Sequence, residues 1–118
     1  MGIAALFLGA GRPLPPGLLV RVDVPPPLFR NADAKAEADS ARRVLTSYCV
    51  AELEDWNRVP HIAFRDRTGT AKLRDGTRVD WTIRPGGIAF LEHPGGEVTY
   101  LLDCRLIRSR SGGQAEPW

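Results

Sequence analysis

The chain has 118 residues, of which 43% are apolar and 25% charged, and its formal net charge is +2. This composition fits one globular α+β domain, expected over residues 1–108 with a flexible tail at 109–118, and so small a charge does not by itself indicate nucleic acid or a membrane surface. No apolar run reaches the roughly 18 residues that a transmembrane helix needs, so we expect no membrane contact and a cytoplasmic location.

The first 17 residues combine an apolar start with a loop rich in proline and glycine. Residues 2–10 lack the basic region of a signal peptide, so we expect them to form a strand or a segment that docks on the core. Residues 11–17 cannot form a helix, because proline fixes φ and removes a backbone donor.

Residues 18–24 predict the first strand, because apolar and polar side chains alternate there. Val20, Val22 and Val24 are expected on one buried face. The three prolines at 25–27 end the strand.

Residues 31–57 predict one long helix. Asn31 or Asp33 can cap its start, since a short side-chain oxygen accepts from the exposed amides of a first turn. The apolar residues recur at steps of three and four, at Ala38, Ala41, Leu45, Tyr48, Cys49, Leu53 and Trp56. This stripe has the width that packs on a sheet. Asn57 and Pro60 are expected to end the helix.

From residue 61 onward the apolar period changes from 3.6 to 2, which predicts strands joined by tight turns. The expected strands are residues 61–67, 70–74, 77–84, 88–92 and 97–107. Asp75 and Gly76 predict a type I′ hairpin, in which both turn residues take a positive φ. Aromatic side chains of these strands are expected to share the core face: Phe64, Trp81, Phe90 and Tyr100.

The predicted order is a strand, a helix and about five further strands, which gives an α+β fold of one long helix packed on an antiparallel meander of five to six strands. This order is similar to that of the cystatin-like and hot-dog folds, in which a sheet wraps one long helix. The resemblance is one of topology alone and implies no function.

None of the common motifs of nucleotide, zinc-protease or α/β-hydrolase chemistry is present, and we assign no catalytic residue, metal site or cofactor. The two histidines, His61 and His93, match no metal-ligand spacing. The two cysteines, Cys49 and Cys104, are expected to face the core and to behave as small hydrophobes, and a single bridge between them is the alternative if the protein is exported.

The segment from residue 58 to 84 holds seven basic side chains against three acidic ones, a local net charge of +4. A basic β-hairpin of this kind can lie along a phosphate backbone. The residues that would form a nucleic-acid-binding site are Arg65, Arg67, Lys72, Arg74, Arg78 and Arg84. The alternative is a solvated outer face whose charges oppose edge-to-edge pairing of strands.

Three hypotheses for function follow. The first is a small non-catalytic binding or accessory protein that acts on a protein partner or as a homodimer, through a sheet edge, the outer sheet face or the apolar start. The second is a nucleic-acid-binding regulator that uses the basic hairpin. The third is a small-ligand binder or enzyme with a pocket between helix and sheet, for which the polar-tipped candidates are Tyr48, Trp56, His61 and Trp81.

Overall fold

A computed structural model describes residues 9–25, 33–61 and 65–107. The elements follow the chain in the order β1 (Leu19–Asp23), α1 (Ala34–Ser47), β2 (Cys49–Ala51), α2 (Leu53–Arg58), β3 (Arg67–Leu73), β4 (Arg78–Arg84), β5 (Ile88–Glu92), β6 (Val98–Leu102) and the 3-10 turn η2 (Cys104–Leu106).

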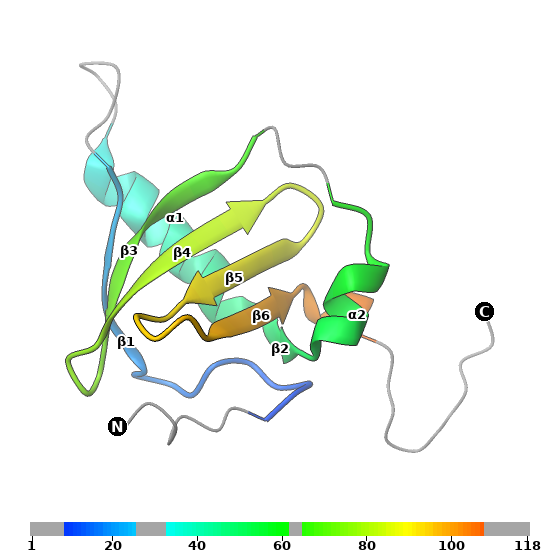
Figure 1. Ribbon diagram of the computed structural model, residues 1–118. Coiled ribbons are helices and arrows are strands. Elements are labelled where there is room, and N and C mark those ends of the chain that lie inside the picture. The colour runs from blue at the N-terminus through cyan, green and yellow to red at the C-terminus, as the bar shows by residue number, and fades with distance from the viewer. Residues whose placement is uncertain (1–8, 26–32, 62–64, 108–118) are drawn as a thin grey trace.

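The strands form one six-stranded sheet in the order β1-β3-β4-β5-β6-β2 (Figure 1). All neighbours are antiparallel, and β3 to β6 follow one another as a meander. The predicted α+β class and the antiparallel meander are therefore confirmed. The strand β2 is an addition to the predicted order, and it extends the sheet beyond β6.

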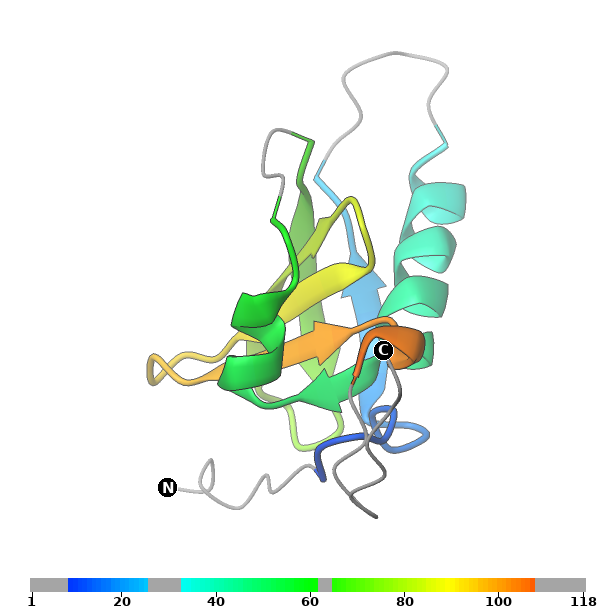
Figure 2. The same ribbon diagram turned by 90° about the vertical axis from the view of Figure 1, so that its right-hand side faces the viewer.

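The two helices lie on opposite faces of this sheet (Figure 2). α1 covers the main core, where Leu45 from the helix packs with Trp81, Leu91 and Leu101 from the strands. Asp33 caps the helix, because its carboxylate accepts from the main-chain amides of the first turn. We call the face under α1 the inner face and the opposite one the outer face.

The prediction of one continuous helix over residues 31–57 is wrong. α1 ends at Ser47, where Tyr48 turns to an extended conformation, and the chain enters the sheet as β2. β2 pairs with β6 and is buried at all three residues, so sheet pairing outweighs the helical spacing of the apolar side chains there. The remainder of the predicted helix becomes α2.

α2 holds a second, smaller core on the outer face, in which Trp56 packs with Ile88, Tyr100 and Leu102. Phe90 also contacts Trp56, at a centroid distance of 5.7 Å. The prediction that Trp81, Phe90 and Tyr100 share one core face is therefore wrong. The side chains alternate along the strands as predicted. The prediction fails because both faces of the sheet carry apolar side chains.

Two local predictions are also corrected. Val20 is exposed because a bulge between Leu19 and Arg21 shifts the register, so it does not share the buried face of Val22. In the turn after β3, Gly76 alone has a positive φ, so the turn is not type I′. The amide of Gly76 donates to the oxygen of Leu73, as in a turn followed by a left-handed glycine.

Cys49 and Cys104 form a disulfide, which corrects the prediction of two free thiols, whereas Cys49 is buried as predicted. The strand predicted over residues 97–107 stops at Leu102 and gives way to η2, so Cys104 is exposed and not on a strand. This turn brings its sulfur to that of Cys49 on β2.

Within the described ranges no helix is long and apolar enough to cross a membrane. The predictions for the apolar start before Gly9, for Ile62 and Phe64, and for the tail at 109–118 lie outside the described residues.

Candidate functional site

Both edges of the sheet are occupied by other parts of the chain. Along β2, the amide of Gly11 donates to the oxygen of Val50 over 2.7 Å, and the amide of Val50 donates to the oxygen of Arg12 over 2.8 Å. At β1, Arg42 of α1 donates from Nη1 to the oxygen of Leu19 over 2.8 Å. These bonds reduce the backbone groups with which either edge could pair to another chain.

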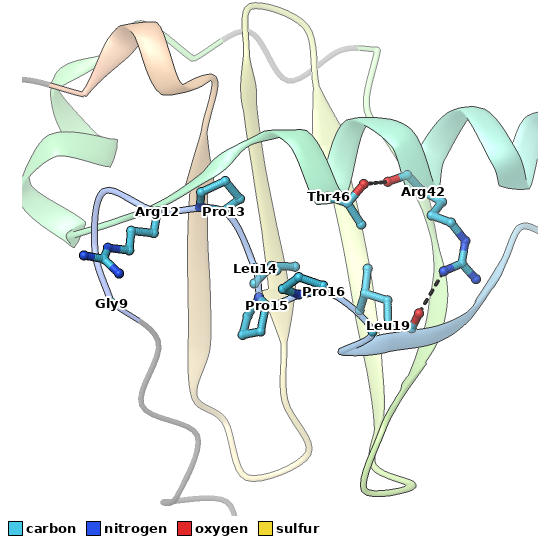
Figure 3. Close-up of a pocket in the computed structure, with 10 residues that line it drawn as sticks. Gly9, Arg12, Pro13, Leu14, Pro15, Pro16, Leu19, Arg42 and Thr46 are labelled. Carbon is cyan, nitrogen blue, oxygen red and sulfur yellow. Dashed lines mark hydrogen bonds between the residues drawn. The ribbon is translucent and has the colours of Figure 1, made fainter.

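The chain between these two edges, residues 9–18, is called here the proline loop. It runs from the edge of β2 to the start of β1 and encloses a cleft against α1 (Figure 3). The cleft has a volume of about 820 Å³ and is partly open to solvent. Its wall consists of Gly9 and residues 12–17 of the loop, Leu19 of β1, and Arg42 and Thr46 of α1.

The loop is held in this shape at its middle and at its end. Leu14 and Leu18 are buried in the main core, whereas Pro13, Pro15 and Pro16 are exposed. The prolines restrict the backbone between the two buried leucines, so their rings form an apolar surface of defined shape.

Arg42 supplies the charge at one end of the cleft. Its guanidinium donates to the oxygens of Leu19 and Val20, and neither partner is a carboxylate. A guanidinium carries five N–H donors in a planar fork, so three remain for a ligand. Its hydroxyl neighbour, Thr46, donates to the main-chain oxygen of Arg42 over 2.7 Å.

Arg12 supplies the charge at the other end, as Figure 3 shows. It is exposed, and in the part of the chain that the structure describes its side chain has no ion pair or hydrogen bond. The cleft thus joins an apolar wall to two cationic groups that lack carboxylate partners among the described residues. This chemistry suits an apolar ligand that carries a negative charge.

The four residues proposed for a pocket between helix and sheet do not meet in one place. Trp81 is buried on the inner face, where Nε1 donates to the oxygens of Thr70 and Asp23 over 3.0 and 3.2 Å. Tyr48 packs at the border of the same core, and burial raises the pKa of its hydroxyl. Trp56 and His61 contact each other on the outer face, with ring centroids 4.3 Å apart.

The six residues of the predicted basic site are spread over both faces and a turn. Lys72 and Arg78 are register partners on the outer face, and Arg74 is exposed at the turn between their strands. Arg84 is on the same face but pairs with Asp66, its Nε lying 3.2 Å from the carboxylate. This site stays a prediction.

The two remaining residues of that set lie elsewhere. Arg67 is the register partner of Ile83, which places its side chain on the inner face, and Arg65 precedes β3 and is exposed. The outer face also carries Phe90 and Tyr100, which the alternation of the sequence predicts on the core face.

Sequence reasoning missed Arg12 and Arg42. Arg42 directly follows Ala41 in the buried stripe of α1, so it borders the covered face and does not lie opposite it. That position is the signal that could have found it. Arg12 lies in a loop without periodicity, and its place depends on the pairing of the loop with β2.

In the described ranges no three side chains of the metal-binding types lie close enough together to hold an ion. The comparisons with known proteins returned no match to a family model, a curated protein or a solved structure.

Proposed function

We propose that this protein is a small non-catalytic binding module that holds an extended, apolar and acidic segment of a partner protein in the cleft between the proline loop and α1. The observation that supports this proposal is the cleft itself, about 820 Å³ in volume, with a proline-lined wall and the cationic groups of Arg12 and Arg42.

The shape favours an extended peptide over a compact small molecule. Sites for small ligands are concave and bury most of the surface of the ligand. A cleft that stays partly open suits a chain that enters at one end and leaves at the other. The two arginines lie at opposite ends, so one acidic group of the segment can meet each of them.

The polar atoms of the loop point to the same kind of partner. Proline has no N–H, so Pro13, Pro15 and Pro16 present carbonyl acceptors only, of which the oxygen of Pro15 already accepts from the amide of Leu18 over 3.1 Å. The backbone amides of an extended segment are matching donors. Arg42 then serves two purposes, since it fixes β1 to α1 and presents its remaining N–H groups to a carboxylate.

A library of short random peptides displayed on phage tests the proposal. The purified protein should enrich peptides that combine apolar residues with aspartate or glutamate. A synthetic copy of an enriched peptide should bind at least tenfold more weakly to Arg42→Gln, since hydrogen bonds to charged groups contribute roughly 1.5–3 kcal/mol. Arg43→Gln is the matched control, because Arg43 is the next residue of α1, is exposed and does not line the cleft.

Arg42→Gln also removes the bond to β1, so a second variant separates binding from stability. Arg12→Gln changes an exposed side chain and should weaken the peptide without shifting the unfolding midpoint. No enrichment of peptides, or equal binding by Arg12→Gln, Arg42→Gln and the control, would contradict the proposal.

The nucleic-acid alternative has its own measurement. Labelled single-stranded DNA, duplex DNA and RNA are titrated at low and at raised salt. Binding that weakens with salt, and that is lost when Arg74, Arg78 and Arg84 are replaced by glutamine, would favour that alternative over the peptide cleft.

The cytoplasmic location expected from the sequence is part of this proposal. The Cys49–Cys104 disulfide is an observation against it. Disulfides persist mainly in oxidising compartments. Alkylation of the protein in intact cells of its source, followed by mass measurement, determines whether the pair is bridged where the protein works.

A further inference from the structure

Among the described residues, no helix covers one part of the outer face of the sheet. In Figure 1, which looks onto this face, α2 lies over the side of β6 and β2, whereas β1, β3 and β4 have no helix in front of them. The inner face of the same strands is covered by α1 and holds the main core. On this part of the face the side chains of Lys72, Arg78 and Asp80 are exposed, whereas Thr82 is buried.

Two of these rows have opposite charge. Register partners share a face, so the pairs Arg21–Lys72 and Lys72–Arg78 place three cations side by side across β1, β3 and β4. We call these three residues the cation row.

The next row lies two residues away on each of these strands and contains Asp23 on β1, Thr70 on β3 and Asp80 on β4. It continues to Glu92 on β5, the register partner of Asp80. We call its three carboxylates the acid row. Rows spaced by two residues are about 7 Å apart.

The charges of the two rows are largely not paired within the chain. Arg21 and Asp23 form an ion pair of 3.0 Å, and their side chains remain 69% and 45% exposed. For Lys72, Arg78, Asp80 and Glu92 the described part of the structure shows no ion pair. The three positive and three negative charges leave the two rows neutral together, so this face does not favour binding of a polyanion. It is complementary to a second surface that carries a cation row and an acid row.

We propose that the outer face of β1, β3 and β4 docks on the same face of a second copy, with the cation row of one copy opposite the acid row of the other. A two-fold axis that runs between the rows, parallel to them, exchanges the two copies. It places Arg21 and Arg78 of each copy opposite Asp23 and Asp80 of the other, and Lys72 opposite Thr70 between these two carboxylates, so the contacts of both rows are favourable at once. Such a self-complementary arrangement is what a two-fold dimer requires.

The neighbouring side chains allow this contact. Packed sheets lie about 10 Å apart, a gap that arginine, lysine and glutamate can bridge. The positions between and beside the charges are occupied by Thr68, Thr70 and Thr82, which are short and do not hold the sheets apart. The cleft lies against α1, on the other side of the sheet, so a dimer of this kind leaves it accessible.

Charge reversal tests the dimer with two single variants and their mixture. On an axis parallel to the rows, Arg78 of one copy lies opposite Asp80 of the partner. Arg78→Glu and Asp80→Arg should each weaken self-association at least tenfold, because each places like charges opposite one another twice. An equimolar mixture of the two variants should associate again, since every opposed pair is then of opposite charge.

Sedimentation equilibrium of the full chain, over a range of protein concentrations at low salt, measures these constants. Arg43→Glu on α1 is the control and should dimerise like the unchanged protein. Circular dichroism confirms that each variant is folded. A protein that stays monomeric at every concentration overturns the proposal. So do dimers that neither reversal weakens, or variants that do not associate when mixed.

Discussion

The guanidinium of Arg84 donates from Nη1 to Nδ1 of His61 over 3.0 Å, and Nε2 of the same ring lies 2.8 Å from the main-chain oxygen of Trp56. A carbonyl oxygen only accepts, and a guanidinium only donates. The proton of the imidazole is therefore on Nε2, and the lone pair of Nδ1 is occupied. Both nitrogens of His61 serve to connect the end of α2 to β4.

Replacement of His61 tests this connection. His61→Ala leaves the oxygen of Trp56 and one N–H of Arg84 without their partner, and it removes a ring contact with the Trp56 indole. We expect the free energy of unfolding to fall by about 1–3 kcal/mol, measured by urea denaturation. Asn57→Ala, a change at an exposed position of α2, should shift this free energy by less than about 0.5 kcal/mol. Equal effects of the two changes would show that the His61 bonds do not stabilise the fold.

Gly69 is needed on β3 because of close neighbours, not because of its φ angle. A Cβ at this position would overlap the ring of Trp81 and the main-chain oxygen of Asp23. That oxygen accepts from the indole of Trp81, so the two neighbours cannot easily move apart. We expect Gly69→Ala to lower the free energy of unfolding by about 1–3 kcal/mol.

Gly95→Ala is the matched control for this substitution. A Cβ there meets nothing within 4 Å, and the φ angle of Gly95 is not in the left-handed region. The free energy of unfolding of the Gly95→Ala protein should stay within about 0.5 kcal/mol of that of the unchanged protein. A Gly69→Ala protein as stable as this control would contradict the close packing of Trp81.

The disulfide closes a loop over a sequence separation of 55 residues. The chain-entropy relation gives a stabilisation of about 4 kcal/mol for a loop of this length, through restriction of the unfolded chain. The double variant Cys49→Ala, Cys104→Ala should therefore unfold at a markedly lower urea concentration. Reduction of the unchanged protein should have a similar effect, and an unfolding midpoint that does not respond to a reductant would show that the bridge adds no stability.

Burial lowers the pKa of His93 below its usual 6.5, while the carboxylates of Glu97 and Asp75 act in the opposite direction. When the pH falls, His93 is protonated in the unfolded chain at a higher pH than in the folded protein. The contribution of His93 to stability is therefore fully present above about pH 6.5, and it is lost as the pH falls from there towards the folded pKa.

His93→Gln removes the titrating group and keeps a side chain that can bond to Thr99, the partner of the Nε2 atom of His93. Between about pH 8 and pH 5 the free energy of unfolding of this variant should change less than that of the unchanged protein. Urea denaturation at several pH values gives both slopes. Parallel slopes would mean that His93 has the same pKa in the folded and unfolded states.

The elements that can be predicted from the sequence are those whose signals are local. The alternation over β4 places Val79, Trp81 and Ile83 on the buried face, as predicted. The stripe through Ala41 and Leu45 gives α1 its buried side in the same way. These patterns can be read from the sequence because the spacing of side chains along one element decides which of them share a face.

Where α1 ends, and which faces of the sheet are covered, depend on contacts between elements that are distant in the sequence. The apolar residues from Tyr48 to Ala51 fit a helical stripe, and they leave the helix because β6, some fifty residues later, offers a pairing partner and Cys104 a bond to Cys49. Strand alternation gives two faces but not which one is covered, so the second core under α2 was not foreseen.

The cleft, too, depends on contacts that are distant in the chain. Arg12 and Arg42 flank it because the proline loop returns to the edge of β2 while α1 crosses the inner face. A loop has no periodic pattern that predicts which side chains are buried. Proline fixes the φ angle of one residue but does not determine where in the fold the loop lies. The site could therefore not be derived from the sequence, since long-range pairing places its residues together.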